Sequence, residues 1–187
     1  MQVFESLENL PRFEDVALTI GTFDGVHLGH QKILEELKKK GRPAVLTFSN
    51  HPMEVIRPIL TPRLILTTAQ KLQLLEQFGV EIVLNLPFTE KIAKTPYDLF
   101  IYSIRAALPF KALVLGEDAR LGAGARGTKI HLKQLGKVTG FETLFVPPLK
   151  IGDETVCSSL IRVYIRTEQF DQARAWLGHS QGIPCQV

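Results

Sequence analysis

One stretch near the start of the chain, residues 16–40, constrains the fold more than any other part of the sequence. Residues 16–20 (VALTI) form a short, mostly apolar run that predicts a buried strand. The segment GTFDGVHLGH (residues 21–30) is a loop punctuated by glycines, and residues 31–37 (QKILEEL) have the apolar spacing of an amphipathic helix. A strand, a glycine loop and a helix in this order begin a β-α-β unit, which favours a parallel sheet.

Two histidines, His27 and His30, stand where this loop becomes the helix. The first turn of a helix has unpaired N–H groups and the positive end of the helix dipole, so it favours an anion. Side chains three positions apart project from nearly the same side, so both imidazoles can face one phosphate group. Gly29 between them has no Cβ, which lets a ligand approach the backbone. One or both histidines could instead only pack or cap the helix, but the pair framing a glycine favours phosphate chemistry.

The rest of the chain alternates apolar runs with helical patterns. We expect strands at 44–48, 81–86, 111–115 and 143–146. We expect helices at 67–78, at 96–108 with Thr95 as N-cap, at 129–135, and at 158–166 and 170–177. Residues 1–15 are expected to be a lead-in. This alternation predicts an α/β fold, a Rossmann-like doubly wound parallel sheet of about five strands with C-terminal helices.

In a sheet of this kind, ligands bind at the carboxyl ends of the strands. The loops that carry function should therefore follow strands directly. The three segments richest in glycine, histidine and other polar residues do so, at 21–30, 48–53 and 116–128. Spacing alone thus predicts that these loops meet at one edge of the sheet.

Bulk properties exclude several classes of protein. The 187 residues suit one domain, 1–187, and 45% hydrophobic residues can fill its core. A net charge of +3 fits an anionic substrate but is too weak to indicate nucleic acid. The two cysteines, Cys157 and Cys185, predict neither a disulfide framework nor a cysteine-rich metal site. No secretory signal and no apolar run near the roughly 20 residues of a membrane span are seen, so we expect a cytoplasmic protein without membrane contact.

The glycine loop resembles a known signature. The run from His27 to His30 is similar to the His-x-Gly-His motif of the nucleotidyltransferase superfamily, and the preceding Phe-Asp-Gly resembles the form found in bacterial FAD synthetases, the FMN adenylyltransferase module of bifunctional riboflavin kinase/FAD synthetases. The segment CSSLIR (157–162) resembles the family's Ser-Ser-Thr-x-Ile-Arg, with Cys157 at the first serine. The segment TFSNHP (47–52) resembles Thr-Phe-x-Pro-His-Pro, with Asn50 in place of a proline.

The fourth matching segment, GEDARLG (116–122), departs from the family pattern Gly-x-Asp-Phe-x-Phe-Gly. Its two aromatic positions hold Ala119 and Leu121. Aromatic side chains would give stacking and apolar area beside a flavin ring. Phe23, Phe48 or a remodelled loop could compensate for their loss.

The resemblance implies that the chain transfers the adenylyl group of ATP to FMN and releases FAD and pyrophosphate. It implies Mg²⁺ bound with ATP through phosphate oxygens and waters, without a dedicated protein ligand set. The implied catalytic residues are His27, His30 and Arg162. The implied ATP-binding residues are Gly21, Thr22, Phe23, Asp24, Gly29, Ser158 and Ser159, and among them Asp24 is expected to shape the loop. The implied FMN-binding residues are Asn50, His51, Pro52, Asp118 and Arg120.

The resemblance covers nearly the whole chain and stops just after Gly178, where a riboflavin kinase barrel would begin. If the chain is complete, we expect no kinase activity and a supply of FMN from a separate riboflavin kinase. Three alternatives stay open. The acceptor could be another phosphorylated compound, such as a phosphopantetheine, nicotinamide mononucleotide or a polyol phosphate; the protein could bind nucleotide or flavin without turnover; or it could have a structural or interaction role.

Overall fold

A computed structural model describes residues 1–183 of the chain. Its centre is a six-stranded sheet in which every neighbouring pair of strands is parallel, in the order β1-β4-β3-β2-β5-β6. The strands are β1 (Gln2–Phe4), β2 (Val16–Ile20), β3 (Arg42–Phe48), β4 (Ile82–Leu86), β5 (Ala112–Gly116) and β6 (Glu142–Val146). The order of the strands reverses between β2 and β5, which are neighbours in the sheet. This is the switch point at which such folds bind ligands.

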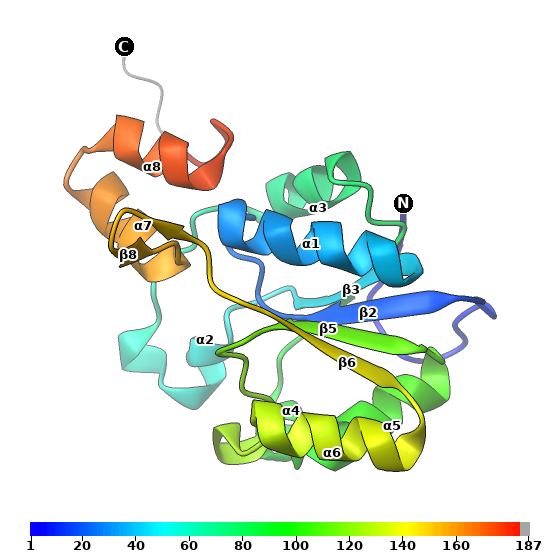
Figure 1. Ribbon diagram of the computed structural model, residues 1–187. Coiled ribbons are helices and arrows are strands. Elements are labelled where there is room, and N and C mark those ends of the chain that lie inside the picture. Colours follow the sequence, from blue (N-terminus) through cyan, green and yellow to red (C-terminus); the bar gives the residue numbers. More distant parts are fainter. Residues whose placement is uncertain (184–187) are drawn as a thin grey trace.

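Helices cover both faces of the sheet (Figure 1). On one face lie α1 (Leu28–Lys40) and α3 (Thr68–Gln77), and on the other lie α5 (Tyr97–Ala107) and α6 (Lys129–Thr139). Each face has its own apolar core, and α7 (Ser158–Arg166) and α8 (Phe170–Leu177) extend the core on the α1 side with Ile161 and Trp176. Because the sheet is buried on both faces, its central strands are almost continuously apolar.

Several short elements follow the carboxyl ends of strands. They are α2 (Pro52–Ile56) and the 3₁₀ turn η1 (Pro58–Leu60) after β3, α4 (Glu90–Lys94) after β4, the 3₁₀ turn η2 (Ala123–Ala125) after β5, and the hairpin β7 (Lys150–Ile151) and β8 (Glu154–Thr155) after β6. The helix α4 contacts both α2 and η2. These insertions therefore build a raised rim around the edge of the sheet where ligands are expected.

The structure confirms the predicted fold class and corrects several details. The sheet has six strands because residues 2–4, expected to be a lead-in, pair with β4. Three residues are too short to show a strand period, so the sequence gives no signal for this edge strand. Pro96 rather than Thr95 is the N-cap of α5, and α6 runs four residues beyond the predicted 135, to Thr139, because Gly140 in the left-handed region ends it.

The two C-terminal helices match their predicted bounds, with Trp176 and Leu177 buried as expected. Cys157 is a free cysteine, and Cys185 lies outside the described residues. Within the described part of the chain, no helix has the length and apolar character needed to cross a membrane.

The glycine-rich segment 116–128 is packed rather than loose. Leu121 and Gly127 form an antiparallel bridge, and the Ala123 N–H donates to the Thr95 carbonyl at 2.8 Å. Gly122 has φ +70°, and a Cβ at this position would collide with the Tyr97 backbone at the start of α5. The segment is therefore held against α5 through a close approach that only glycine permits.

We predict that Gly122→Ala destabilises the protein by about 2–4 kcal/mol, because it adds a clash with Tyr97 to the conformational cost of a positive φ. Gly152→Ala is the matched control, since Gly152 has φ +61° and no neighbour within 4 Å of a built Cβ. The control should cost only about 1 kcal/mol. Urea unfolding followed by the fluorescence of the single, buried Trp176 measures both, and equal losses would contradict the packing argument.

Candidate functional site

A cavity of about 1250 Å³ opens at the carboxyl ends of the strands. The loops after β2, β3 and β5 line it together with the start of α7, so the three loops singled out by spacing do meet. The predicted site residues that line it are Gly21, Thr22, Phe23, His27, Gly29, His30, His51, Pro52, Asp118, Arg120, Ser158, Ser159 and Arg162. Asp24 and Asn50 do not line this cavity and instead border a small neighbouring pocket.

The two histidines of the glycine loop form a stacked pair. His27 is the N-cap of α1, and its Nδ1 accepts a hydrogen bond from the His30 backbone N–H at 3.3 Å. Their ring centroids are 3.7 Å apart, with an interplanar angle of 16°. Because Nδ1 of His27 is an acceptor, the network assigns the proton of the neutral ring to Nε2. The Nδ1 atom of His30 is buried without a hydrogen-bond partner in the described structure, while other parts of the residue line the cavity.

The loop around these histidines is shaped by Gly29 and Phe23. A Cβ at Gly29 would lie 3.2 Å from the His27 ring, so the missing side chain makes room for the imidazole. Gly29 also lines the cavity, so its backbone borders the space where a ligand is expected. Phe23 has φ +50°, is 1% exposed, and its ring lies 4.8 Å from that of His30. Phe23 thus packs against the His30 ring of the histidine pair.

Burial keeps the histidines of the site uncharged. Desolvation lowers the pKa of His27 to about 4, with the Arg162 charge adding to the effect. Desolvation, followed by the charges of His27 and Lys71, also lowers the pKa of His30 well below its usual value. The pKa of His51 is lowered, first by desolvation and then by Arg162. Near pH 7 these rings are neutral, and each offers a single N–H donor to a ligand.

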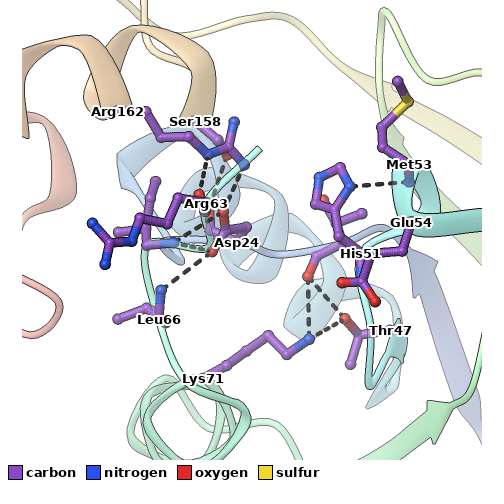
Figure 2. Close-up of polar contacts among 12 residues, drawn as sticks. Asp24, Thr47, His51, Met53, Glu54, Arg63, Leu66, Lys71, Ser158 and Arg162 are labelled. Carbon is purple, nitrogen blue, oxygen red and sulfur yellow. Dashed lines mark hydrogen bonds and ion pairs between the residues drawn. The ribbon is translucent and has the colours of Figure 1, made fainter. Parts of the chain in front are cut away.

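Arg162 is held by a buried carboxylate. Its Nη2 pairs with Oδ2 of Asp24 at 2.6 Å, and its Nε donates to the Arg63 carbonyl at 2.9 Å (Figure 2). Asp24 is 3% exposed, so the pair is shielded from water. A guanidinium has five N–H donors, and these two bonds leave three of them for other partners. Arg162 is therefore fixed in place on the cavity wall while keeping donors to spare.

The other contacts of Asp24 fix backbone. Its Oδ1 accepts hydrogen bonds from the N–H groups of Ile65 and Leu66 at 3.0 and 3.3 Å. Its own carbonyl accepts a 2.8 Å hydrogen bond from the Ser158 hydroxyl. Asp24 thus joins the glycine loop to the segment before α3 and to the start of α7, as expected of a residue that shapes the loop.

Two polar residues of the loop after β3, Asn50 and His51, make different kinds of contact. The Asn50 amide accepts from the Phe88 N–H at 2.7 Å and donates to the Phe88 carbonyl at 3.1 Å, so it ties this loop to the one after β4. His51 caps α2, since its Nδ1 accepts from the Met53 N–H at 3.1 Å and its own N–H donates to Glu54 at 3.0 Å. His51 therefore faces the cavity in a fixed orientation, while Asn50 supports the wall behind it.

Part of the cavity is apolar, and it includes Phe48, one of the residues expected to compensate for the missing aromatic side chains. Phe48 and Phe88 stand edge to face there, with ring centroids 5.0 Å apart and an interplanar angle of 87°. Met53 on α2 and Ile92 on α4 extend the same wall. The signal that could have located this wall was the apolar content of the segments following β3 and β4.

Lys71 is a polar residue of this region that the sequence argument missed. It is 8% exposed and donates three hydrogen bonds to groups at the ends of β2 and β3 (Figure 2). Its place on the buried face of α3, in helical register with Leu74 and Leu75, was the available signal. Among the described residues, no group of three or more His, Cys, Asp or Glu side chains is arranged to hold a metal ion.

Comparisons with known proteins identify the family and the relatives that the chain resembles. The sequence model of the FAD synthetase family matches residues 10–160. The bifunctional riboflavin kinase/FMN adenylyltransferase of Escherichia coli K12 is 30% identical over 195 residues, which cover 100% of this chain and 62% of that protein. The FAD synthetase of Listeria monocytogenes is 32% identical over 172 residues, covering 87% of this chain and 68% of the relative. The chain thus spans less than two thirds of the length of the bifunctional relative.

Solved structures show the same architecture. The crystal structure of a macrolide-efflux protein from Streptococcus pneumoniae superposes with a TM-score of 0.82 at 25% identity, covering 95% of this chain and 61% of the other. A pantoate–β-alanine ligase from Francisella tularensis, crystallised with a β,γ-ATP ligand and β-alanine, gives a TM-score of 0.60 at 14% identity over 94% of this chain and 85% of its own. The second likeness shows the fold alone. Because the sequence model of the FAD synthetase family matches most of the chain, the protein belongs to that family.

Proposed function

We propose that this chain transfers the adenylyl group of ATP to FMN, forming FAD and pyrophosphate. A phosphate oxygen of FMN attacks the α-phosphorus of ATP, and the bond to the bridging oxygen breaks so that pyrophosphate leaves with the electron pair. The observation that carries the proposal is the convergence on one cavity of the His27–His30 stack, the start of α7 and an apolar wall. The reaction needs no protein nucleophile, so catalysis consists of positioning and charge stabilisation.

The histidine pair would act on the α-phosphate. His27 and His30 are neutral donors at the N-terminus of α1, where unpaired N–H groups already favour an anion. In our proposal His30 stabilises the charge that develops at the α-phosphate, and Gly21, Thr22 and Gly29 bring backbone close to the nucleotide. Fixed donors are effective here because they need no reorganisation as the charge develops.

The start of α7 would hold the departing phosphates. Arg162 keeps three N–H donors beyond its bonds to Asp24 and Arg63, which is enough for a bidentate contact with phosphate oxygens. Ser159 is exposed at the cavity, whereas the Ser158 hydroxyl already donates to the Asp24 carbonyl. We therefore assign Ser158 mainly to positioning and Ser159 with Arg162 to the β- and γ-phosphates.

The apolar wall would take the flavin ring. Phe48 at the end of β3 and Phe88 in the loop after β4 supply aromatic surface, which offsets the non-aromatic Ala119 and Leu121 on the loop after β5. His51, Pro52, Asp118 and Arg120 remain the candidates for the polar part of FMN, and Asn50 acts by holding the Phe88 backbone. This arrangement supports FMN as the acceptor despite the altered loop.

Mg²⁺ would enter with ATP. The cavity offers phosphate-binding donors but no cluster of protein carboxylates among the described residues, so the ion is assigned to phosphate oxygens and waters. Bound there, it would neutralise part of the triphosphate charge. FMN is proposed to come from a riboflavin kinase, an activity that the bifunctional relatives carry by name in the same chain.

The direct test is incubation of the purified protein with ATP, Mg²⁺ and FMN, followed by chromatography for FAD and an assay for pyrophosphate. Riboflavin, phosphopantetheine, nicotinamide mononucleotide and a polyol phosphate are run in parallel. FAD and pyrophosphate in equal amounts support the proposal. Adenylylation of another acceptor without FAD, or nucleotide binding without any product, overturns it.

We predict that His30→Ala lowers kcat for FAD formation by a factor on the order of 10²–10³, the usual loss when one donor to a developing charge is removed. His131→Ala is the control, because His131 is an exposed histidine on α6 away from the cavity. Circular dichroism should show both variants folded. Turnover of His30→Ala within a few-fold of the wild type would refute its role.

We also predict that binding of Mg·ATP at pH 6 takes up protons. His27 has a pKa of about 4 before binding, so it is neutral at pH 6, and a nearby triphosphate raises that pKa by favouring the imidazolium. Calorimetry in buffers of different ionisation enthalpy counts the protons. His27→Gln should take up fewer protons than the wild type, and equal uptake would place the triphosphate away from His27.

A further inference from the structure

We propose that Lys71 is a positioning residue for adenylyl transfer, whose buried amino group joins the carboxyl ends of β2 and β3 beneath the phosphate end of the cavity and supplies positive charge there. The inference deepens the proposed function and rests on it. Lys71 belongs to none of the motifs that indicated the site, and it does not line the large cavity. It therefore acts through the residues that it holds.

The contacts of Lys71 link two loops. Its Nζ donates to the Phe48 carbonyl at 2.7 Å, to the Thr47 hydroxyl at 3.1 Å and to the Thr22 carbonyl at 3.4 Å. The Thr47 hydroxyl in turn donates to the same Thr22 carbonyl at 2.9 Å. All three ammonium hydrogens are used, and both of the joined segments, at Thr22 and at Phe48, line the cavity.

The charge of Lys71 has no direct counter-ion, because each of its three acceptors is a carbonyl or a hydroxyl. The nearest opposite charge that affects it is the carboxylate of Asp24, which is already paired with Arg162. Its charge is felt at His30 and His51, whose pKa values it helps to lower. The positive charge of Lys71 therefore acts at His30, which is proposed for the α-phosphate, and at His51, which is proposed for the polar part of FMN.

Burying this ammonium costs the fold stability. Desolvation lowers the pKa of Lys71 from 10.5 to about 8, although Asp24 opposes the shift. A methionine of similar length would fill the same space beside Leu74 and Leu75 without that desolvation cost, but it would leave the Thr22 and Phe48 carbonyls without the Lys71 donor. Burial of the Lys71 ammonium thus costs folding free energy, while its hydrogen bonds join two segments that line the cavity. A role in the site therefore explains this lysine better than packing of the core does.

The first test compares Lys71→Met with Lys137→Met, an exposed lysine on α6 away from the cavity. We expect Lys71→Met to lower kcat for FAD formation by at least about tenfold and to raise the Kd of Mg·ATP by about threefold or more, with Lys137→Met within about twofold of wild type. Lys71→Met relieves the desolvation of the ammonium but also removes its three hydrogen bonds, so turnover and Kd are compared where circular dichroism shows both variants folded. Wild-type turnover and Kd in folded Lys71→Met overturn the inference.

The pH profile separates charge from packing. The alkaline limb of wild-type turnover should include the deprotonation of Lys71, at or above about pH 8, and Lys71→Met should lack that component. Unfolded Lys71 keeps its proton to about 10.5, so the stability of wild type should rise relative to Lys71→Met between pH 8 and 10.5. Identical alkaline limbs in the two proteins would rule out a role for the charge.

A double-mutant cycle with Thr47 tests whether Lys71 acts through the Thr47 hydroxyl. Thr47→Val removes the hydroxyl that joins Lys71 to Thr22 while keeping the shape of the side chain. If Lys71 acts through this hydroxyl, the double variant should lose less than the product of the two single losses. Independent, multiplicative losses would contradict that route.

Failure of the proposed function can be told apart from failure of this inference. If wild type forms no FAD, the function fails, and Mg·ATP binding alone then decides the role of Lys71. An unchanged Kd in Lys71→Met refutes the inference whether or not FAD is made.

Discussion

The buried carboxylate of Asp24 is the interaction on which the site depends. It receives the Arg162 guanidinium and two backbone N–H groups, and its own carbonyl receives the Ser158 hydroxyl. Parts of the chain separated by more than 130 residues are thus fixed to one turn of the glycine loop. Breaking one partner of a buried ion pair is costly, because the other charge is left desolvated. Arg162 and Ser158 of α7, proposed to serve the phosphates, are therefore held in place relative to α1 in the ligand-free structure.

The site carries an excess of positive character that the fold itself does not need. Asp24 balances Arg162, but Lys71 is bonded only to neutral groups, and the start of α1 adds the positive end of a helix dipole. In the ligand-free structure the histidines are neutral near pH 7, so they add donors without adding charge. The proposed triphosphate would supply the missing negative charge, and this complementarity is the physical link between the ligand-free structure and the proposed substrate.

The sequence predicted most of the fold because apolar runs and helix signals in this chain agree with each other. Spacing located the three loops of the site. Of the candidate site residues taken from the motifs, all but Asp24 and Asn50 line the cavity. It missed the edge strand at residues 2–4 and the short helices α2 and α4, whose few residues show no period. It did not reveal Lys71 or the bonds of Asn50 to the Phe88 backbone, since pairing of a polar side chain with a distant backbone leaves no local pattern.

The placement of the short elements separates the two halves of the chemistry. The proposed phosphate-binding elements, α1, α7 and the glycine loop, are all anchored to the core on the α1 side of the sheet. The wall proposed for the flavin combines Phe48 and Phe88 with Met53 on α2 and Ile92 on α4, and α2 and α4 lie at the rim with no buried residue. Because α2 and α4 bury none of their residues, changes in them need not disturb the two cores. If adenylyl transfer is the activity, replacing these two short helices would be a route to a different acceptor on the same sheet.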